Sequence, residues 1–492
     1  MENQNSNPKT ELSPMQPEAF FKYFYEISAS PRNSGEEEKI ADYLCAFAKA
    51  HGLFYDRDEH RNVLICKAAT PGYEHCAPLL IQGHTDMVCE TAPGRTHDFT
   101  TMPIDVYRDG DVLRARGTTL GADDGAAVAY MMMLLSDDTI EHPPLQCLFT
   151  AEEETGLCGA TNFDYSKITA AAMINLDGER EGEATVGCAG GVRCYYDKKL
   201  KKTPLPPKFK ETYRISVTGL CGGHSGADIH KNRLNANRVL AEILRTVSAE
   251  MPIRLCAFSG GSKDNAIPRS ADAVIACQGK AQLISALMAC ELHFRGMLSP
   301  EDKNFKIELS EEKCSTACSK KETAEIIDFL LGHENGVIKM SEDIAGLVET
   351  SANAGIVKFG CDDNIFHVSV SMRSSIDAEK KWHQEINAAL ARKLGFSVVY
   401  GQEYPGWAYR KDSRIREIYK TAYRKTHGGA EPTISAIHAG LECGIVSCAL
   451  PELDIIALGP TMDFVHTPDE YLEIPSVLRL HETIIEMLKS MK

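Results

Sequence analysis

Acidic and imidazole side chains stand at five places in the 492-residue sequence, each shortly after an apolar segment. Imidazole and carboxylate groups together form the ligand set of zinc, and also of manganese and cobalt. Five such ligands can hold two cations when one carboxylate bridges them, and a cation pair can activate water and stabilise the oxyanion of acyl transfer. A carboxylate outside the ligand set must still accept the proton of that water. The candidates are His84 and Asp86, Asp123 and Asp124, Glu152 to Glu154, Asp177, and His466.

Each of these places also has an ordinary explanation when it is taken alone. Asp-Asp-Gly before an apolar run is commonly a helix cap or a turn, and Asp-Gly after a strand is commonly a turn. A run of glutamates is usually a solvated helix start, and single histidines are common in cores and on surfaces. The occurrence of all five in one order, each after a buried-strand pattern, favours a shared site over these explanations.

The elements around these residues indicate an α/β fold with a mostly parallel sheet. An apolar helix is predicted at residues 125–135, and the strand candidates alternate with helices. In such sheets ligands gather beyond the carboxyl ends of the strands, so we expect the five places to meet at one edge. Buried strands are predicted at residues 62–68, 77–83, 145–151, 171–177 and 453–459.

A helix is predicted near the N-terminus, from Ser34 to Gly52. Ile40, Leu44 and Phe47 recur there at helical spacing. The Asn-Ser-Gly sequence that begins at residue 33, followed by acidic residues, favours a cap at this point, because both suit the positive end of a helix.

The pattern changes after the glycine-rich segment that ends at Gly191 and returns near Trp407. Between these points, alternating strands and long amphipathic helices indicate a separate α+β domain. We therefore predict an α/β catalytic domain of residues 1–190 and 406–492, interrupted by an inserted α+β domain of residues 191–405.

Composition excludes several classes of function. The formal net charge of −16 is a poor match for nucleic acids or anionic membranes, which need a basic footprint. The 17 cysteines include no Cys-x-x-Cys pair, which argues against zinc knuckles and thioredoxin-like sites. The polar N-terminus has no apolar core of a secretory signal, and the longest apolar run, residues 126–135, is too short to span a bilayer. We expect a protein of the reducing cytoplasm, with no membrane and no nucleic-acid partner.

Taken in order, the motifs resemble the co-catalytic metallopeptidases that include carboxypeptidase G-type enzymes, aminoacylases and carnosinases. These motifs are HTD, GADDG, EEETG, NLDGE and the late His466. More narrowly, the chain resembles the aminoacyl-histidine dipeptidase branch (Xaa-His dipeptidase, peptidase D), and the likeness spans nearly the whole chain after the N-terminal tail. The segments that carry this narrower resemblance are Ala115–Asp123, Gly187–Gly191, Gly222–His230, Tyr404–Trp407, Ile437–Gly444 and His466–Glu470.

The resemblance implies a ligand set for two divalent cations, with zinc first and manganese or cobalt as alternatives. His84 and Asp177 would hold one cation, and Glu154 and His466 would hold the other. Asp123 would bridge the two, since the first acid of the Asp-Asp pair is the bridge in this family.

The resemblance also implies a general base and a residue that orients a ligand. Glu153 would accept the proton of the water and then donate it to the leaving amine. Asp86 would orient His84 through the free ring N–H of that histidine. A slip of one residue within Glu152–Glu154 would reassign both the base and the ligand, and the alignment on the following Gly156 favours Glu153 as base.

The inserted domain supplies the substrate-binding residues that the resemblance implies. His224 matches the histidine that helps polarise the scissile carbonyl, and it acts from the same subunit or from a partner. Asn265 and Arg373 match the residues that bind the oxyanion and the terminal carboxylate, which an arginine fork fits geometrically. His438 and Glu442 are expected to line the pocket.

The sequence therefore predicts a metallo-dipeptidase that hydrolyses unblocked dipeptides, with Xaa-His dipeptides as the expected substrates. The inserted domain would act as a lid and as the surface of a homodimer. The alternatives are a broader di- or tripeptidase and an N-acyl-amino-acid deacylase of the same superfamily. A metal-binding scaffold without activity is disfavoured, because every ligand position and the base are filled.

Overall fold

A computed structural model describes residues 16–209, 211–360 and 363–492. The predicted absence of a secretory signal concerns mainly residues 1–15, which lie outside the described part, as does Cys361. The chain forms two compact units. The first comprises the described residues up to Gly187 together with Tyr409–Ala436 and Leu441–Lys492, and the second comprises Cys188–Ala408 and Ile437–Gly440.

The first unit contains an eight-stranded sheet in the order β1-β2-β6-β3-β7-β23-β8-β22. The central strands β6, β3, β7 and β23 run parallel to one another, whereas the pairs β1–β2, β2–β6 and β23–β8 are antiparallel. The α/β prediction is thus confirmed, with a parallel centre inside a mixed sheet. The strands are β1 (Phe54–Arg57), β2 (Val63–Lys67), β3 (Leu79–His84), β6 (Leu145–Thr150), β7 (Ala172–Asn175), β8 (Glu183–Cys188), β22 (Thr433–Ile437) and β23 (Asp454–Ala457).

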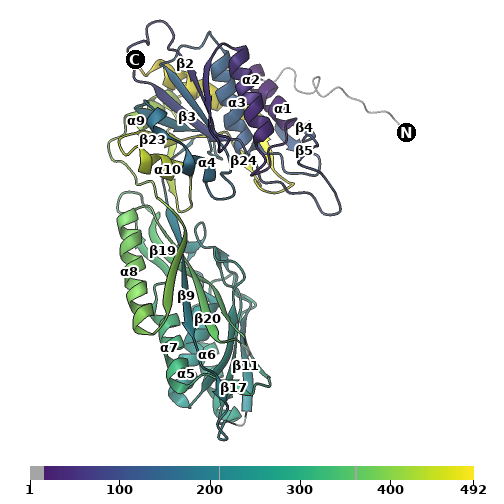
Figure 1. Cartoon of the computed structure of the whole chain (residues 1–492), viewed down its shortest axis with the longest axis vertical. Helices are drawn as coiled ribbons and strands as arrows, with labels where there is room; N and C mark the ends of the chain where they lie inside the picture. The colour runs from purple at the N-terminus through teal and green to yellow at the C-terminus, as the bar shows by residue number, and fades with distance from the viewer. Residues whose placement is uncertain (1–15, 210, 361–362) are drawn as a thin grey trace, which may run out of the picture. The chain divides into compact units, whose positions relative to one another are not determined.

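Helices pack against this sheet and bury its apolar residues (Figure 1). Helix α3 contacts β3 and α1, helix α2 contacts β1 and β2, and helix α9 contacts β23 and α11. Helix α3 is apolar on all sides and is buried along nearly its whole length, as expected of a core helix. The helices are α1 (Glu18–Ser28), α2 (Glu38–Ala50), α3 (Ala122–Ser136), α4 (Cys158–Asn162), η2 (Tyr165–Lys167), α9 (Arg414–Thr426), α10 (Glu442–Ala449) and α11 (Ile474–Lys489).

One local prediction differs from the structure of this unit, and another gains detail. Helix α2 begins at Glu38 and has no side-chain cap, so the predicted cap at residues 33–35 is wrong. Ser34 instead donates a hydrogen bond to Asp86 at 2.7 Å. His466 follows the buried strand β23 as expected but only after the short strand β24, which belongs to a second sheet of order β24-β25-β5-β4. That sheet consists of β4 (Val106–Asp109), β5 (Val112–Ala115), β24 (Met462–Asp463) and β25 (Tyr471–Glu473), and His466 lies between β24 and β25.

The second unit is an α+β structure built on a nine-stranded sheet of order β16-β11-β15-β13-β19-β20-β9-β21, with β18 paired to β19. All pairings recorded in this sheet are antiparallel. Its strands are β9 (Gly190–Lys199), β11 (Glu211–Thr218), β13 (Arg254–Gly260), β15 (Ala271–Cys277), β16 (Lys306–Glu311), β18 (Gly336–Met340), β19 (Val348–Phe359), β20 (Ile365–Ser374) and β21 (Ser397–Tyr404).

The helices of the second unit cover this sheet and close one continuous apolar core. Helix α5 contacts β11, β15 and β19, while α8 contacts β9, β20 and β21. The helices are α5 (Ala236–Glu250), α6 (Lys280–Arg295), α7 (Lys320–Gly332), α8 (Asp377–Lys393) and η3 (Ile229–Lys231). Two further strand pairs are β10 (Thr203–Pro204) with β17 (Thr316–Ala317) and β12 (Gly223–His224) with β14 (Ala266–Ile267).

Within the described ranges, no helix has both the length and the apolar character that a bilayer crossing requires.

Candidate active site

The carboxylate of Asp123 lies between two histidine rings in the first unit. Its Oδ1 atom is 3.0 Å from Nε2 of His84, and its Oδ2 atom is 3.0 Å from Nε2 of His466. His84 is the last residue of β3, and Asp123 stands at the start of α3 in a non-helical conformation. One carboxylate thus presents each of its oxygens to a different imidazole, which is the arrangement that a bridging ligand requires.

Asp177 completes one candidate ligand group with His84 and Asp123. The ligand atoms of these three residues lie within 4.8 Å of one another, and Oδ1 of Asp177 is 3.6 Å from Nε2 of His84. The parallel pairing of β7 with β3 explains this proximity, because the two strands end side by side and Asp177 follows β7 by two residues.

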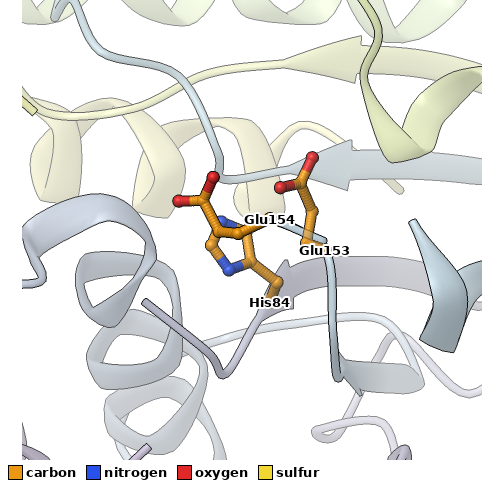
Figure 2. Close-up of side chains that lie close together, drawn as sticks. All are labelled: His84, Glu153 and Glu154. Carbon is orange, nitrogen blue, oxygen red and sulfur yellow. The ribbon is translucent and has the colours of Figure 1, made fainter. Parts of the chain in front are cut away.

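Glu154 completes a second candidate group with Asp123 and His466. Its Oε1 atom is 2.8 Å from Nε2 of His466, and this buried oxygen has no hydrogen bond of good geometry among the described residues. Glu153 and Glu154 also form a group with His84, and Figure 2 shows both carboxylates on the same side of that imidazole. The loop after β6 therefore presents two neighbouring carboxylates to the cluster.

Asp86 holds the ring of His84 and the loop that carries the two glutamates. Its Oδ1 atom lies 3.2 Å from Nδ1 of His84 and accepts a hydrogen bond from the backbone N–H of Glu153 at 3.0 Å. Its Oδ2 atom accepts hydrogen bonds from Glu154 N (3.2 Å) and Ser34 Oγ (2.7 Å). The side chain is fully buried, so these contacts fix its position and leave Nε2 of His84 directed at the cluster.

The first of the three glutamates lies outside the cluster. The carboxylate of Glu152 pairs with Nη2 of Arg61, and the Nε atom of Arg61 is 3.2 Å from the buried carboxylate of Glu37. Glu37 also accepts a hydrogen bond from Glu152 N at 3.0 Å. These contacts favour the register in which Glu153 and Glu154, and not Glu152, carry the chemistry.

Asp124 is adjacent to Asp123 but has different contacts, because its carboxylate accepts hydrogen bonds from the backbone. Its Oδ2 atom accepts a hydrogen bond from the backbone N–H of His84 at 3.1 Å, and its Oδ1 atom accepts one from Ala127 N at 3.2 Å. Burial raises the pKa of this carboxyl well above its usual range. Asp124 therefore joins the start of α3 to the end of β3.

Two buried charged residues that sequence reasoning did not single out support the Asp123 loop. The carboxylate of Glu470 accepts hydrogen bonds from the backbone of Leu120 (2.7 Å), Gly121 (3.0 Å) and Ala122 (2.7 Å). Arg32 donates to the carbonyl of Gly121 and, at 3.2 Å, to the carbonyls of residues 85 and 86. Glu470 could have been found from its place in the His466–Glu470 motif, whereas Arg32 has no local signal.

The cluster is electrostatically unusual, because several acids share a small buried space. Burial raises the pKa of Asp177 to about 8 and raises the pKa of Glu153 well above its usual range, and neighbouring carboxylates add to both shifts. The carboxylates of Asp123 and Glu154 beside its ring raise the pKa of His466 to about 11. Burial would lower the pKa of His84, but its contacts with Asp123, Asp177 and Asp86 outweigh burial and raise it.

The residues of this cluster fit a pair of divalent cations. The donor set of imidazole and carboxylate oxygen is that of zinc, manganese or cobalt. Glu154 Oε1 is buried without a well-formed hydrogen bond, which is expected of an atom that would ligate a cation. Two imidazoles alone face these several carboxylates. Bound cations would add positive charge that compensates the carboxylates.

A buried hydrogen-bond network connects Glu442 of the predicted pocket to Asp177 of the cluster. The Oε2 atom of Glu442 accepts hydrogen bonds from Gln82 and, at 2.7 Å, from Thr150. Gln82 in turn accepts from Asn175 at 2.8 Å, and Asn175 accepts from the backbone N–H of Asp177 at 3.2 Å. Burial raises the pKa of Glu442 to about 7. Glu442 is 1% exposed, so it supports the strand ends and does not face solvent.

The second unit contains His224 and Asn265, which line a cavity of about 800 Å³. Nδ1 of His224 accepts backbone hydrogen bonds from Gly226 (3.2 Å) and Ala227 (3.0 Å). The neutral ring therefore carries its proton on Nε2, which makes that atom a hydrogen-bond donor. The carbonyl of Asn265 accepts a hydrogen bond from Ser225 N at 2.8 Å and so ties the two predicted residues together.

Arg373 and His438 also lie in the second unit. Nη1 of Arg373 donates to the phenol oxygen of Tyr404 at 3.0 Å, and Nε2 of His438 lies 2.7 Å from Oγ of Ser351. Burial, followed by the charge of Arg373, lowers the pKa of His438 to about 3 and also lowers that of His224. Both imidazoles are therefore neutral near pH 7.

The predicted site residues thus form two groups. The structure brings the five predicted ligands together with Asp86 and Glu153 in the first unit. Glu442 is connected to this group through the buried network described above. The second unit holds His224, Asn265, Arg373 and His438.

The chain is similar to known proteins over nearly its whole length. A family model described as Peptidase family M20/M25/M40 matches residues 80–490. The cytosol non-specific dipeptidase of Escherichia coli (strain K12) is 36% identical over 489 residues, covering 98% of this chain and 99% of that protein. The aminoacylhistidine dipeptidase structure from Vibrio alginolyticus matches with a TM-score of 0.92 and 33% identity over 98% of both chains. The aminopeptidase PepT structure from Bacillus cereus, 16% identical over 97% of this chain and 99% of that chain, has a TM-score of 0.56 and shares the fold.

Proposed function

The chain belongs to peptidase family M20/M25/M40 and is a hydrolase of peptide bonds, and we propose that it is a metal-dependent dipeptidase that cleaves unblocked dipeptides. The observation that carries the proposal is the position of Asp123 between the rings of His84 and His466. The dipeptidase names of the Escherichia coli and Vibrio alginolyticus relatives, both matched over nearly their whole length, support it.

In this proposal the cluster holds two divalent cations, most simply zinc. His84 and Asp177 would hold one, Glu154 and His466 would hold the other, and Asp123 would be shared. When bound, the two cations supply Lewis acidity that activates a water as the nucleophile and stabilises negative charge on the peptide oxygen. Asp86 keeps the ring of His84 in the tautomer that leaves Nε2 free to ligate.

Glu153 is the proposed general base and, after bond cleavage, the acid that protonates the leaving amine. Its carboxylate stands beside the ligand group but outside the two sets that share Asp123. A carboxyl group with a raised pKa both accepts and returns a proton near neutral pH, which suits this double task.

The second unit supplies the proposed contacts to the substrate. Nε2–H of His224 donates to the oxyanion of the scissile carbonyl, supported by the two backbone bonds that hold its Nδ1 as an acceptor. Asn265 assists the same oxygen, and Arg373 binds the terminal carboxylate of the dipeptide. The sequence resemblance supports the further proposals that this unit is a lid and that it forms a homodimer.

The names of the two relatives give different substrate ranges. The relative from Vibrio alginolyticus is called an aminoacylhistidine dipeptidase, and that from Escherichia coli a non-specific dipeptidase. We propose Xaa-His dipeptides as good substrates within a broader dipeptide range. We also propose a cytoplasmic location, which the word cytosol in the name of the Escherichia coli relative supports. An N-acyl-amino-acid deacylase is the alternative function.

A substrate panel with defined metal content tests the proposal. Protein stripped with a chelator is reloaded with zinc, manganese or cobalt in turn and offered Ala-His, β-Ala-His, Ala-Leu, a tripeptide and acetyl-amino acids. Release of free amino acids from the dipeptides by reloaded protein only is the expected result. Release of acetate without dipeptide cleavage would replace the proposal with the deacylase, and two bound cations with no hydrolysis at all would refute it.

A further inference from the structure

Three sequence segments that the proposed mechanism leaves unused meet around the side chain of Tyr404. They contain Gly191, Tyr404 itself and Gly440. A Cβ atom added to Gly191 would lie 2.6 Å from the phenol oxygen of Tyr404, and one added to Gly440 would lie 2.8 Å from Cε2 of its ring. Real Cβ atoms do not approach other atoms so closely. The ring therefore occupies a slot that exists because both flanking residues are glycine.

The strand register places this ring in one row with Arg373. Arg373 is paired with Ser351 on one side and with Gly191 on the other, and Gly191 is paired with Tyr404. Directly paired residues of antiparallel strands point to the same face of a sheet. Because Gly191 contributes no side chain, the side chains of Tyr404 and Arg373 can reach toward each other over Gly191, across two strand spacings of about 10 Å. The phenol oxygen of Tyr404 lies 3.0 Å from Nη1 of Arg373.

A local irregularity in β21 brings Tyr404 into this row. The register of β21 against β9 shifts between Gly401 and Tyr404, and Gln402 within the shift has φ of 48°. A non-glycine residue in the left-handed region is uncommon and unfavourable. Bulges of this kind re-aim a side chain next to functional sites, and here the re-aimed side chain is Tyr404.

The guanidinium that Tyr404 contacts has capacity left for a ligand. Arg373 is only 5% exposed, and its Nε atom has no hydrogen-bond partner among the described residues. The polar groups that the structure places near it, the phenol of Tyr404 and the neutral rings of His438 and His224, bring no negative charge. A buried cation with an unused donor is suited to a carboxylate, which accepts two parallel hydrogen bonds from one fork.

We propose that Tyr404 is a positioning residue for carboxylate recognition. Its phenol oxygen accepts a hydrogen bond from Nη1 of Arg373 and fixes the plane of the guanidinium, so that the remaining N–H groups meet the terminal carboxylate of the substrate. Gly191 opens the path between the two side chains, and Gly440 leaves room for the ring. The inference rests on the proposed function, which assigns the terminal carboxylate to Arg373.

The variant Tyr404→Phe tests this role, because it keeps the ring in its slot and removes only the hydroxyl. Steady-state kinetics are measured with Ala-His and with its C-terminal amide, which lacks the carboxylate. For Ala-His we expect KM to rise ~10-fold, the usual effect of losing one hydrogen bond to a charged group, with little change in kcat. For the amide, wild type and variant are expected to have equal kcat/KM. The matched control is Tyr400→Phe on the same strand, whose hydroxyl lies 3.4 Å from the carbonyl of Gln384, and it should keep the wild-type KM.

The same experiment separates a failure of this inference from a failure of the carboxylate assignment. An unchanged KM in Tyr404→Phe, or an equal rise for Ala-His and its amide, would overturn the positioning role. If Arg373→Met loses the preference for acid over amide while Tyr404→Phe keeps it, only the inference fails. If wild-type protein cleaves acid and amide equally well, the assignment of the carboxylate to Arg373 fails and the inference fails with it.

Discussion

Oδ2 of Asp123 lies 3.0 Å from Nε2 of His466, although 343 positions separate the two residues in the sequence. The contact joins the start of α3 to the loop between β24 and β25. Because the other oxygen of Asp123 meets His84 at the same distance, two distant parts of the chain converge on one carboxylate. This convergence is the structural basis of the proposed cation pair.

Replacement of Glu153 by glutamine should remove turnover and leave metal binding intact. The amide cannot accept the proton of the attacking water, and general-base catalysis is commonly worth ~10²–10⁴-fold. We expect kcat to fall by that order, while metal content measured by inductively coupled plasma mass spectrometry stays at the wild-type value.

Glu152→Gln is the matched control within the same run of glutamates. Its carboxylate pairs with Arg61, outside the cluster, so near-normal kcat is expected. If Glu152→Gln were inactive and Glu153→Gln active, the register of base and ligand proposed above would be wrong.

Replacement of Glu470 by glutamine should destabilise the loop that carries Asp123. One carboxylate accepts hydrogen bonds from three successive backbone N–H groups at 2.7 to 3.0 Å, and an amide would turn a donor toward some of them. We expect the free energy of unfolding in urea to fall by about 2–3 kcal/mol and cations to be lost more readily on dialysis.

Glu473→Gln serves as the comparison for Glu470, because its carboxylate forms a partly exposed ion pair with Arg479 at 3.3 Å. A pair of this kind contributes at most about 1 kcal/mol. Equal effects of the two substitutions would show that the Glu470 contacts do not hold the loop.

The buried ring of His333 should make the stability of the protein depend on pH. Burial, followed by the charge of Arg238, lowers the pKa of His333 to about 4, below the 6.5 of an ordinary histidine. Between these two values the unfolded chain binds more protons, so the free energy of unfolding falls as pH falls through this window. The total loss of stability is on the order of 3 kcal/mol. It is absent well above pH 6.5 and complete only below about pH 4.

The variant His333→Asn isolates this contribution, since its amide can replace the contact of Nδ1 with the carbonyl of Phe329 at 2.8 Å. Urea unfolding at pH 7 and pH 5 should show that wild type loses about 2 kcal/mol more than the variant over this interval. Contributions common to both proteins cancel in the difference. Parallel losses would mean that His333 does not titrate in this range.

The central sheet was predictable because its strands are short apolar runs. Residues 77–83, 145–151 and 171–177 fall on β3, β6 and β7, and their parallel pairing follows from the helices between them. Strand direction at the edges was not predictable, because an apolar run such as residues 62–68 carries no signal of the neighbour it pairs with. The observed β2 runs antiparallel to β6.

The ligand candidates were accessible from sequence because each is a chemically distinctive residue in a recognisable motif. Their assigned roles stay predictions until metal content is measured. The supporting residues were not accessible, because Arg32 and Glu37 act through contacts with chain segments far away in sequence. The row that joins Tyr404 to Arg373 depends on strand register and on a bulge, neither of which the sequence specifies locally.

Anomalous diffraction from crystals of the zinc-loaded, full-length protein tests the central claim most directly. Two peaks at the zinc edge are predicted, roughly 3.5–4 Å apart as in other two-metal sites. One should lie against Oδ1 of Asp123 beside His84 and Asp177, and the other against Oδ2 beside Glu154 and His466. A single peak, or peaks away from Asp123, would contradict the shared-carboxylate site.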